Sequence, residues 1–272
     1  MSFSKKQIMI MQKKIFEKYA AMAVTDAGRV RNHNEDNVLI DEELGLLLVA
    51  DGMGGHQAGE IASMEAINVI QQMIRLQQRT IKKQSGFFRF FGKSKSNPDE
   101  YQSALEKALY EANHHIHQLN IERNICDGSG MGTTVAGCWL IADNTMLVFH
   151  VGDSRVYRFR KQKLELLTKD HSVLQAWHDN GCEGEKPKSN VILRAIGPFP
   201  EAQSEIQVKA IDEGDGFLIC SDGLTDMLDD ANIENILQGL TGDQLGGYSQ
   251  KLLQSALNQG GKDNVSIILF AQ

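Results

Sequence analysis

Short apolar runs that end in a carboxylate beside a glycine recur along this chain, and they constrain its fold more than any other feature. The three clearest runs occupy residues 46–52, 146–153 and 217–223. Each run has the length of a β-strand, so its carboxylate should emerge where the strand leaves the sheet. The three carboxylates are Asp51, Asp153 and Asp222. A single strand-end Asp-Gly could be a simple turn, but the recurrence predicts that several carboxylates meet at one rim of a sheet.

Two Asp-Asn pairs extend this pattern. Asp36-Asn37 precedes the apolar residues 38–40, and Asp263-Asn264 precedes the mostly apolar run 265–270. Carboxylates that gather at one place repel one another, so they need cations between them. Oxygen ligands alone suit hard ions such as Mg²⁺ or Mn²⁺ better than they suit zinc. The sequence therefore predicts a site for Mg²⁺ or Mn²⁺.

The remaining patterns predict many strands and a few long helices. Strands are expected near residues 19–25, 37–41, 44–50, 132–142, 145–151, 154–160, 163–167, 205–210, 215–220 and 264–270. Helices are expected near residues 58–78, 98–122, 230–238 and 243–258. Strands near the start, middle and end of the chain, with two long helices between them, favour an α+β sandwich over regular βαβ alternation.

We expect one domain over residues 19–272 with three peripheral segments. Residues 1–18 are polar and basic with scattered Met and Ile, and we interpret them as a short extension or helix. Residues 79–97 form a basic insertion that we expect to be mobile, and residues 172–190 form a short polar surface flap. The Phe and Lys or Arg residues of the insertion leave two alternatives open: a surface that docks an acidic partner or a membrane, or a solvated insertion.

The composition limits the partners and the location of the protein. A net charge of −7 argues against a general nucleic-acid-binding protein. No apolar stretch reaches the roughly 18–20 residues of a membrane span, and the apolar run at residues 8–11 is too short for a secretory signal. The four cysteines lack Cys-x-x-Cys spacing, which indicates reduced thiols. We therefore expect a cytoplasmic protein without a membrane span.

A cation lies close in sequence to two of the acids. Arg31 precedes Glu35 and Asp36 in a polar segment over residues 26–37. Beside a carboxylate–metal site, the planar guanidinium can hold two oxygens of a phosphate group. Taken alone, the segment is better explained by a surface arginine that pairs with Glu35 than by an arginine that binds phosphate.

The ordered set of motifs decides between these interpretations. It comprises the Arg31 segment, Asp51-Gly52-Met53-Gly54-Gly55, Gly132-Thr133-Thr134, Gly152-Asp153-Ser154-Arg155, Ser221-Asp222-Gly223-Leu224-Thr225-Asp226 and Asp263-Asn264. In this order, the set resembles the metal-dependent type 2C protein serine/threonine phosphatases in their bacterial form. The resemblance covers about residues 20–270 and implies a four-layer α-β-β-α sandwich, with two central antiparallel sheets, helices outside and metals at one end.

The resemblance implies that two metal ions bind tightly and that a third binds more weakly. Asp51 would bridge the two tight ions, and the carbonyl of Gly52 would bind one of them. Asp222 and Asp263 would hold the other. Asp153, sharing Asp222, would hold the third ion. Mn²⁺ and Mg²⁺ both fit, because they take the same ligands.

The resemblance also implies roles for neighbouring residues. Arg31 would bind the substrate phosphate, and Glu35 and Asp36 would act mostly through metal-bound waters. Some eukaryotic relatives carry a His directly after the bridging Asp-Gly as a proposed general acid, but this chain has Met53 there. His56 lies three residues later, and we interpret it as a loop residue rather than as a replacement acid.

The implied activity is hydrolysis of phosphoserine and phosphothreonine on proteins by a metal-activated hydroxide. No Cys is followed six positions later by Arg, and no Asp-x-Asp occurs, so motifs for a phosphoenzyme are missing. The implied partners are phosphorylated proteins and a cognate serine/threonine kinase in bacterial signalling, and we expect a monomer that binds no nucleic acid. A catalytically weak regulatory or binding module of the same fold is disfavoured because Asp51, Asp222 and Asp263 are intact. A two-metal nuclease is disfavoured by the acidic charge.

Overall fold

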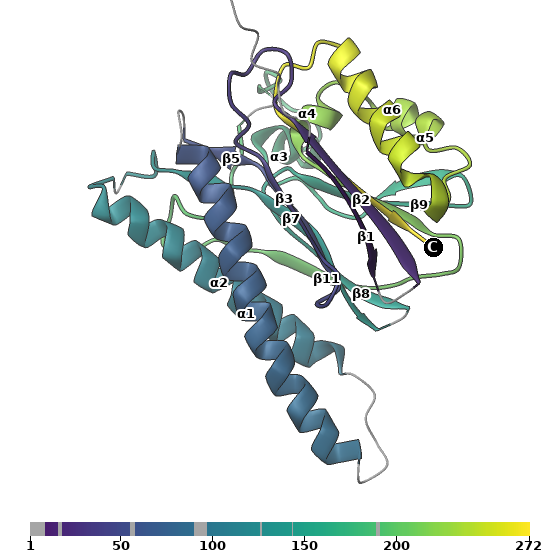
Figure 1. Ribbon diagram of the computed structural model, residues 1–272. Helices are drawn as coiled ribbons and strands as arrows, with labels where there is room; N and C mark the ends of the chain where they lie inside the picture. Colours follow the sequence, from purple (N-terminus) through teal and green to yellow (C-terminus); the bar gives the residue numbers. More distant parts are fainter. Residues whose placement is uncertain are drawn as a thin grey trace, which may run out of the picture.

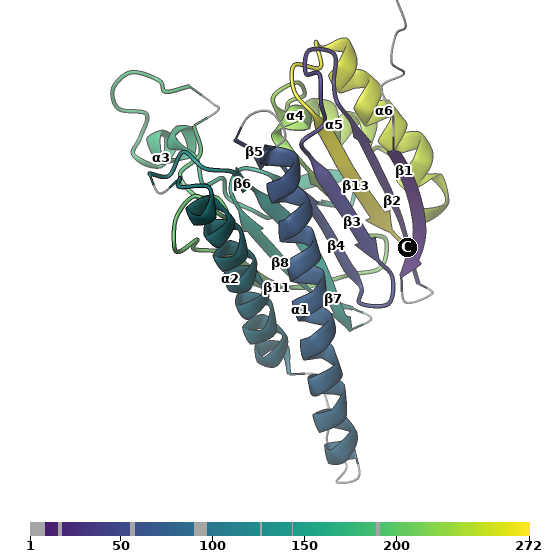
Figure 2. The same ribbon diagram turned by 60° about the vertical axis from the view of Figure 1, so that its left-hand side comes forward.

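The computed structural model describes residues 9–15, 18–54, 58–89, 97–125, 127–142, 144–188 and 191–272, with the backbone alone for residues 9–14 and 82–89. Within these residues, two antiparallel sheets lie face to face, and helices cover both outer faces (Figures 1 and 2). This confirms the α+β sandwich that the sequence pattern predicted and the four-layer α-β-β-α arrangement that the resemblance implied.

The first sheet contains six strands in the order β1-β2-β13-β12-β9-β10. Its strands are β1 (Met9–Ile15), β2 (Tyr19–Asp26), β13 (Val265–Ala271), β12 (Gly216–Cys220), β9 (Arg155–Arg160) and β10 (Lys163–Leu166). Strand β13, the last in the chain, pairs on one side with β2 and on the other with β12. This pairing sets Val265 opposite Asp26, and it therefore brings Asp263 beside the loop that follows β2.

The second sheet contains five strands in the order β11-β8-β7-β4-β3. Its strands are β11 (Glu205–Ala210), β8 (Thr145–Val151), β7 (Val135–Ala142), β4 (Leu46–Ala50) and β3 (Asn37–Asp41). Every residue of β4 is buried, because the strand lies between two neighbours and has packed layers on both faces. A continuous apolar run is what such a doubly covered strand requires.

A pair of two-residue strands marks the end of the sandwich that carries the candidate site. Strand β5 (Gly52–Met53) directly follows β4 and Asp51, and it pairs with β6 (Gly132–Thr133). The sequence predicted one strand over residues 132–142, but the structure interrupts it at Thr134. Thr134 leaves the ladder because its side chain and backbone bond to Asp51 instead.

The helices are α1 (Ala58–Arg89), α2 (Pro98–Glu122), α3 (Val173–Asp179), α4 (Asp222–Thr225), α5 (Asp230–Ile236), the 3₁₀ turn η1 (Gly242–Gln244) and α6 (Leu245–Asn258). The long helices α1 and α2 cover one outer face, and α4, α5 and α6 lie on the other (Figure 1). Helices α1 and α2 bury Ile70 and Leu105 against Trp139 of the five-stranded sheet, whereas α6 buries Leu252 against the six-stranded sheet. Burial of each such side chain stabilises the fold by roughly 1.5–3 kcal/mol.

A third apolar layer fills the space between the two sheets. The rings of Phe217 and Phe270 stack there with their centroids 4.7 Å apart. Val49 of β4 reaches the same layer from the opposite sheet. The sheets are thereby fixed relative to each other, and the strand ends that carry the acids are fixed with them.

Helix α1 is longer than the sequence indicated. We expected it to end near residue 78, with a mobile insertion after it, but it continues to Arg89. Ile81 explains the difference, because it is buried in the same cluster as Tyr101 of α2. Between Gly59 in its first turn and Gly86, the helix contains no Gly or Pro. Residues 79–89 of the predicted insertion are therefore helical, and residues 90–96 lie outside the described residues.

The predicted N-terminal extension contains a strand. Residues 9–15 form β1, which pairs along its whole length with β2, from Met9 opposite Thr25 to Ile15 opposite Tyr19. Ile15 is fully buried between the sheets. The interpretation of this segment as a short extension or helix was wrong for residues 9–15, because a strand at a sheet edge is stabilised by its partner rather than by its own sequence.

The predicted flap contains a short helix, and it lies at the same end of the molecule as β5 and β6 (Figure 2). Helix α3 begins after Ser172, whose Oγ accepts a hydrogen bond of 3.1 Å from the backbone N–H of Gln175. Residues 189–190 of this segment lie outside the described residues.

No helix in the described part of the chain combines the length and the apolar character that crossing a membrane demands.

Candidate metal centre

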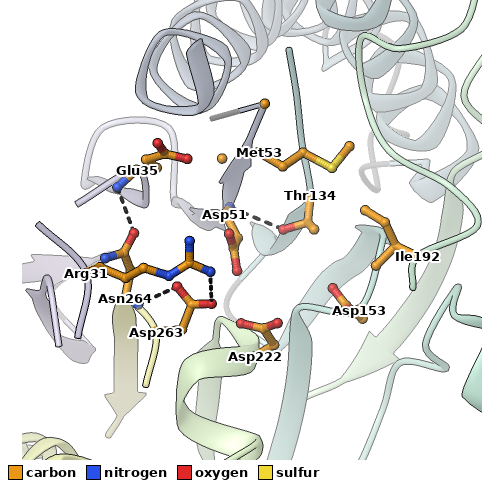
Figure 3. Close-up of a pocket in the computed structure, with 12 residues that line it drawn as sticks. Arg31, Glu35, Asp51, Met53, Thr134, Asp153, Ile192, Asp222, Asp263 and Asn264 are labelled. Atoms are coloured by element: carbon orange, nitrogen blue, oxygen red, sulfur yellow. Dashed lines mark hydrogen bonds and ion pairs between the residues drawn. The ribbon is translucent and has the colours of Figure 1, made fainter. Parts of the chain in front are cut away.

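Acidic side chains from distant parts of the chain point into one cavity at the end of the sandwich (Figure 3). The cavity has a volume of about 310 Å³ and is lined by Arg31, Glu35, Asp51, Gly52, Met53, Gly54, Thr134, Asp153, Ile192, Asp222, Asp263 and Asn264. Seven of the eight site residues predicted from the sequence belong to this lining. The eighth, Asp36, is buried and does not line the cavity.

Asp51 is held at the end of β4 by Thr133, the last residue of β6, and by Thr134, which follows it. Its backbone N–H donates to Thr134 Oγ1 at 3.2 Å, and its carbonyl accepts from the backbone N–H of Thr134 at 2.9 Å. Thr133 Oγ1 donates to the same carbonyl at 2.9 Å. With the backbone fixed on both sides, the Asp51 carboxylate can only project into the cavity.

Gly52 allows helix α1 to approach the site. A Cβ atom at this position would lie 2.1 Å from the carbonyl oxygen of Gly59 and 2.5 Å from that of Glu35. Any side chain would therefore push the first turn of α1 away from Asp51. The shape of the cavity wall thus depends on a glycine at this position.

Two buried carboxylate oxygens lack a donor in the described part of the chain, one on Asp222 in the cavity lining and one on Asp36 outside it. Asp36 Oδ2 accepts a hydrogen bond of 2.8 Å from Ser221 Oγ, but Asp36 Oδ1 and Asp222 Oδ1 have no hydrogen-bond partner among the described residues. A buried carboxylate oxygen without a donor is costly, and such atoms are rare in native proteins. Hard divalent ions bind oxygen ligands of this kind. The donor set therefore fits Mg²⁺ or Mn²⁺.

The electrostatics of the acids support the same conclusion. Burial raises the pKa of Asp51 well above its ordinary value, and the charges of Asp36 and Asp222 raise it further. Burial likewise raises the pKa of Asp222, with the charge of Asp153 as the next cause. The pKa values of Asp36 and Asp153 rise to about 6, again chiefly through burial. Bound cations would offset both the burial of the charged carboxylates and their mutual repulsion, the two causes that keep these pKa values high.

We expect Mn²⁺ binding to weaken as the pH falls through about 6. The raised pKa values mean that protons occupy these carboxyls below that pH, and a metal ion must displace them. Each displaced proton should cost about tenfold in apparent affinity per pH unit. Calorimetry at pH 6 in two buffers with different ionisation enthalpies measures the protons released. Equal heats in both buffers would contradict this prediction.

Arg31 lies at the mouth of the cavity. Its Nη2 donates to Asp263 Oδ2 at 2.6 Å, and the arginine side chain is 56% exposed. This hydrogen bond raises the pKa of Arg31. The sequence left open whether Arg31 pairs with Glu35 or serves the site, and the structure directs its guanidinium to a carboxylate of the cavity (Figure 3).

Asn264 is a residue of the site to which the sequence analysis gave no role. Its Oδ1 accepts from the backbone N–H of Glu35 at 2.8 Å, and its Nδ2 donates to the carbonyls of Ala27 and His33. The Asn264 side chain thus holds the loop that carries Arg31 and Glu35 against the beginning of β13. The Asp263-Asn264 pair in the sequence was the one feature that could have indicated a role for Asn264.

Four other residues near the cavity bear on the sequence analysis. Thr134 and Ile192 line the cavity, although only the former stood in a recognised motif. The charge of Asp226 contributes to the raised pKa values of Asp153 and Asp222, so a further acid lies near them. Met53 lines the cavity at the position where some eukaryotic relatives carry a His. His56 lies outside the described residues.

Comparisons with known proteins identify the family of this chain. A sequence model described as protein phosphatase 2C matches residues 28–258. The serine/threonine phosphatase Stp of Listeria innocua is 32% identical over 253 residues, which cover 90% of this chain and 92% of the relative. The crystal structure of the Mycobacterium tuberculosis serine/threonine phosphatase PstP gives a TM-score of 0.77 at 29% identity and covers 93% of this chain and 98% of the other.

A second solved structure bears on the metal. It is the catalytic domain of the serine/threonine protein phosphatase PstP in complex with two manganese ions, and it gives a TM-score of 0.74 at 30% identity. The match covers 93% of this chain and 97% of the other. The family match, the identity to relatives over most of the chain and the shared fold lead to one conclusion: this chain belongs to the protein phosphatase 2C family.

Proposed function

We propose that this protein removes phosphate from phosphoserine and phosphothreonine residues of proteins with the help of bound Mn²⁺ or Mg²⁺. The observation that carries the proposal is the convergence of Asp51, Asp153, Asp222 and Asp263 in one cavity with Arg31 at its mouth. The relatives named above are serine/threonine phosphatases, and one of them binds two manganese ions.

We assign the metal ligands as the family resemblance implies. Asp51 would be the ligand shared by the two tight ions, the Gly52 carbonyl would bind one ion, and Asp222 and Asp263 would hold the other. Asp153 would hold a third, weaker ion together with Asp222. When bound, the ions supply Lewis acidity, an activated water and neutralisation of the phosphate charge.

The other residues of the site bind and orient. The Arg31 guanidinium is placed to form two hydrogen bonds to a phosphate group, and its bond to Asp263 keeps it directed into the cavity. Glu35 and Asp36 stand behind the ligands and act through water. Ser221 holds Asp36 in place through the hydrogen bond to Oδ2. Asn264 anchors the loop that carries Arg31.

The chemistry of the substrate indicates the cellular setting. Phosphorylated serine and threonine on proteins are made by serine/threonine kinases, so a kinase of that class must supply the substrate. We propose that the protein opposes such a kinase in bacterial signalling, and that it acts in the cytoplasm as a monomer.

Phosphate release from a phosphothreonine peptide tests the proposal. We expect turnover in the presence of Mn²⁺ with phosphothreonine and phosphoserine peptides, and none with a DNA substrate. Asp51→Asn serves as the inactive control. Metal binding without peptide turnover would support the regulatory module instead, and cleavage of DNA would support the nuclease.

Arg31→Ala should raise KM for a phosphothreonine peptide about tenfold and lower kcat less. Interactions made equally in the ground state and the transition state act on KM, and a charge-assisted hydrogen bond contributes about 1.5–3 kcal/mol. Arg31→Lys should recover only part of the loss, because an ammonium group cannot make the two-pronged contact. Steady-state kinetics measure both effects.

Arg29→Ala is the matched control for this experiment. Arg29 is two residues away, and its Nε donates to the carbonyl of Leu257 rather than lining the cavity. We expect this variant to keep KM within about twofold of the wild type. Metal affinity of Arg31→Ala is measured separately, because Arg31 contacts Asp263. Loss of metal binding in Arg31→Ala, or an unchanged KM, would make Arg31 a structural ion-pair partner.

A further inference from the structure

Gly152, the residue before Asp153, has a backbone conformation that only glycine adopts easily. Gly152 has a φ of +107°, a conformation that L side chains rarely adopt. A Cβ atom there would also lie 2.6 Å from Cγ2 of Thr134. The chain therefore needs glycine at this position. Glycine in turn imposes little preference on φ and ψ, so something else must fix the direction in which Asp153 leaves β8.

His171 supplies that restraint on both sides of the glycine. The backbone N–H of Gly152 donates to His171 Nδ1 at 3.1 Å, and the backbone N–H of His171 donates to the Gly152 carbonyl at 2.9 Å. The first bond fixes the peptide plane before the Gly152 Cα, and the second fixes the plane after it. Because peptide planes are rigid, one residue thereby sets φ and ψ of Gly152 and the start of Asp153.

The imidazole is itself held in place and in one tautomer. Nδ1 accepts from Gly152, so the proton of the neutral ring lies on Nε2, which donates to Glu205 Oε1 at 3.1 Å. The ring stacks on His150 with centroids 4.4 Å apart, and His171 is only 6% exposed. Burial lowers the pKa of His171 to about 4, with the charge of His150 as the next cause, so the ring stays neutral near pH 7.

The same contacts argue against a second metal site here. His150, His171 and Glu205 place one ligand atom each within 4.8 Å of one another. A metal on His171 Nε2 would need the proton on Nδ1, which would then face the N–H of Gly152. In addition, Arg194 Nη1 lies 3.1 Å from Nε2, and this cation would repel a metal ion. The contacts of this cluster therefore fix the imidazole of His171 and disfavour a bound metal ion.

We propose that His171 is a positioning residue that places Asp153 for its role at the weaker metal site. The inference rests on the proposed function, since it assumes that Asp153 is a ligand. It predicts that loss of the Nδ1 acceptor weakens the third ion and leaves the two tight ions bound.

A pair of variants isolates the hydrogen bond to Gly152. In His171→Asn, the amide oxygen occupies the place of Nδ1, so the acceptor is kept. In His171→Gln, the amide reaches the place of Nε2, so the acceptor for Gly152 is lost while the contact with Glu205 remains possible. Asp153→Asn provides the reference without the proposed ligand. Mn²⁺ titration by calorimetry counts the sites and measures their affinities, and hydrogen exchange of the Gly152 amide reports the bond directly.

We expect His171→Gln to lower the affinity of the weaker site about 10–100-fold and to speed exchange of the Gly152 amide, with the two tight sites unchanged. His171→Asn should stay within about threefold of the wild type. If His171→Gln does not fold, Glu205→Ala, which removes the partner of Nε2 together with the ion pair to Arg194, should shift the weaker site in the same direction. Unchanged affinity of the weaker site in His171→Gln would overturn the proposal, as would equal losses in the two His171 variants.

The proposed function is checked independently by peptide turnover of the wild type. A wild type that turns over the phosphothreonine peptide while Asp153→Asn keeps the weaker site would overturn the role of His171 and leave the phosphatase function standing. A wild type without turnover would count against the phosphatase function itself. The two failures are therefore distinguishable.

Discussion

Replacing Asp51 with Asn should lower kcat/KM for a phosphothreonine peptide by at least about 10³-fold, which corresponds to about 4 kcal/mol. Burial raises the pKa of Asp51 most, and the charges of Asp36, Asp222, Asp153 and Asp263 raise it further, so Asp51 lies near all four acids. As the ligand proposed to be shared by both tight ions, it cannot be lost without losing the pair. The kinetic assay is combined with Mn²⁺ titration, which should show the tight sites empty.

The stability of Asp51→Asn separates a lost ligand from a damaged fold. The amide keeps the shape of the carboxylate and removes a buried charge from a repelling group, so the metal-free variant should be at least as stable as the metal-free wild type. Asp153→Asn is the matched control, because it removes a cavity carboxylate that is assigned only to the weaker site. It should keep both tight sites. If the two variants show the same metal stoichiometry, the assignment of ligands is wrong.

Chelation should abolish turnover, and added Mn²⁺ or Mg²⁺ should restore it. The described residues that line the cavity include five carboxylates, which we propose hold metal ions, and no cysteine or histidine nucleophile, so the proposed reaction depends on the ions. Binding should also stabilise the fold. At a free Mn²⁺ concentration of 100 times the Kd, one site adds about 2.7 kcal/mol, which raises Tm by about 5–10 °C.

Thermal unfolding with and without EDTA measures this effect beside the activity. Asp51→Asn should show little or no rise in Tm with Mn²⁺, because its tight sites are lost. The comparison with the wild type removes any general effect of the salt. Full peptide turnover after exhaustive chelation would contradict the metal-dependent mechanism, and a rise in Tm of the same size in Asp51→Asn would contradict the assignment of the shared ligand.

The acids of the site could be predicted because their signal is local. A buried strand such as β4 needs a continuous apolar run, and the Asp-Gly that ends it marks where the chain reaches solvent. The same reasoning identified Asp222 after β12 and Asp153 after β8, and all three line one cavity. Recurrence of a local pattern thus predicted a shared site before any contact was known.

The supporting residues could not be predicted in this way. The bond between Asp51 and Thr134 joins residues 83 apart in sequence, and the bond between Glu35 and Asn264 joins residues 229 apart. No local pattern distinguishes such a threonine or asparagine from one on a surface turn. The restraint that His171 places on Gly152 is of the same kind, since only the packed fold brings the ring to the turn.

The limits of two elements were also decided by tertiary contacts. Helix α1 continues past residue 78 because Ile81 finds an apolar partner surface on α2. Strand β1 forms because β2 offers an unpaired edge. In both cases the local sequence permits several conformations, and the neighbour selects one of them.

The sequence by itself determined the fold class, the order of the motifs and the identity of the acids, because each of these follows from apolar periodicity and from residues adjacent to it. Only the tertiary structure decided how the acids behave. Their raised pKa values and the unpartnered oxygens of Asp36 and Asp222 arise from burial and from the mutual distance of charges. Those quantities exist only when strands distant in sequence lie side by side, since electrostatic energy depends on separation in space and on the removal of water.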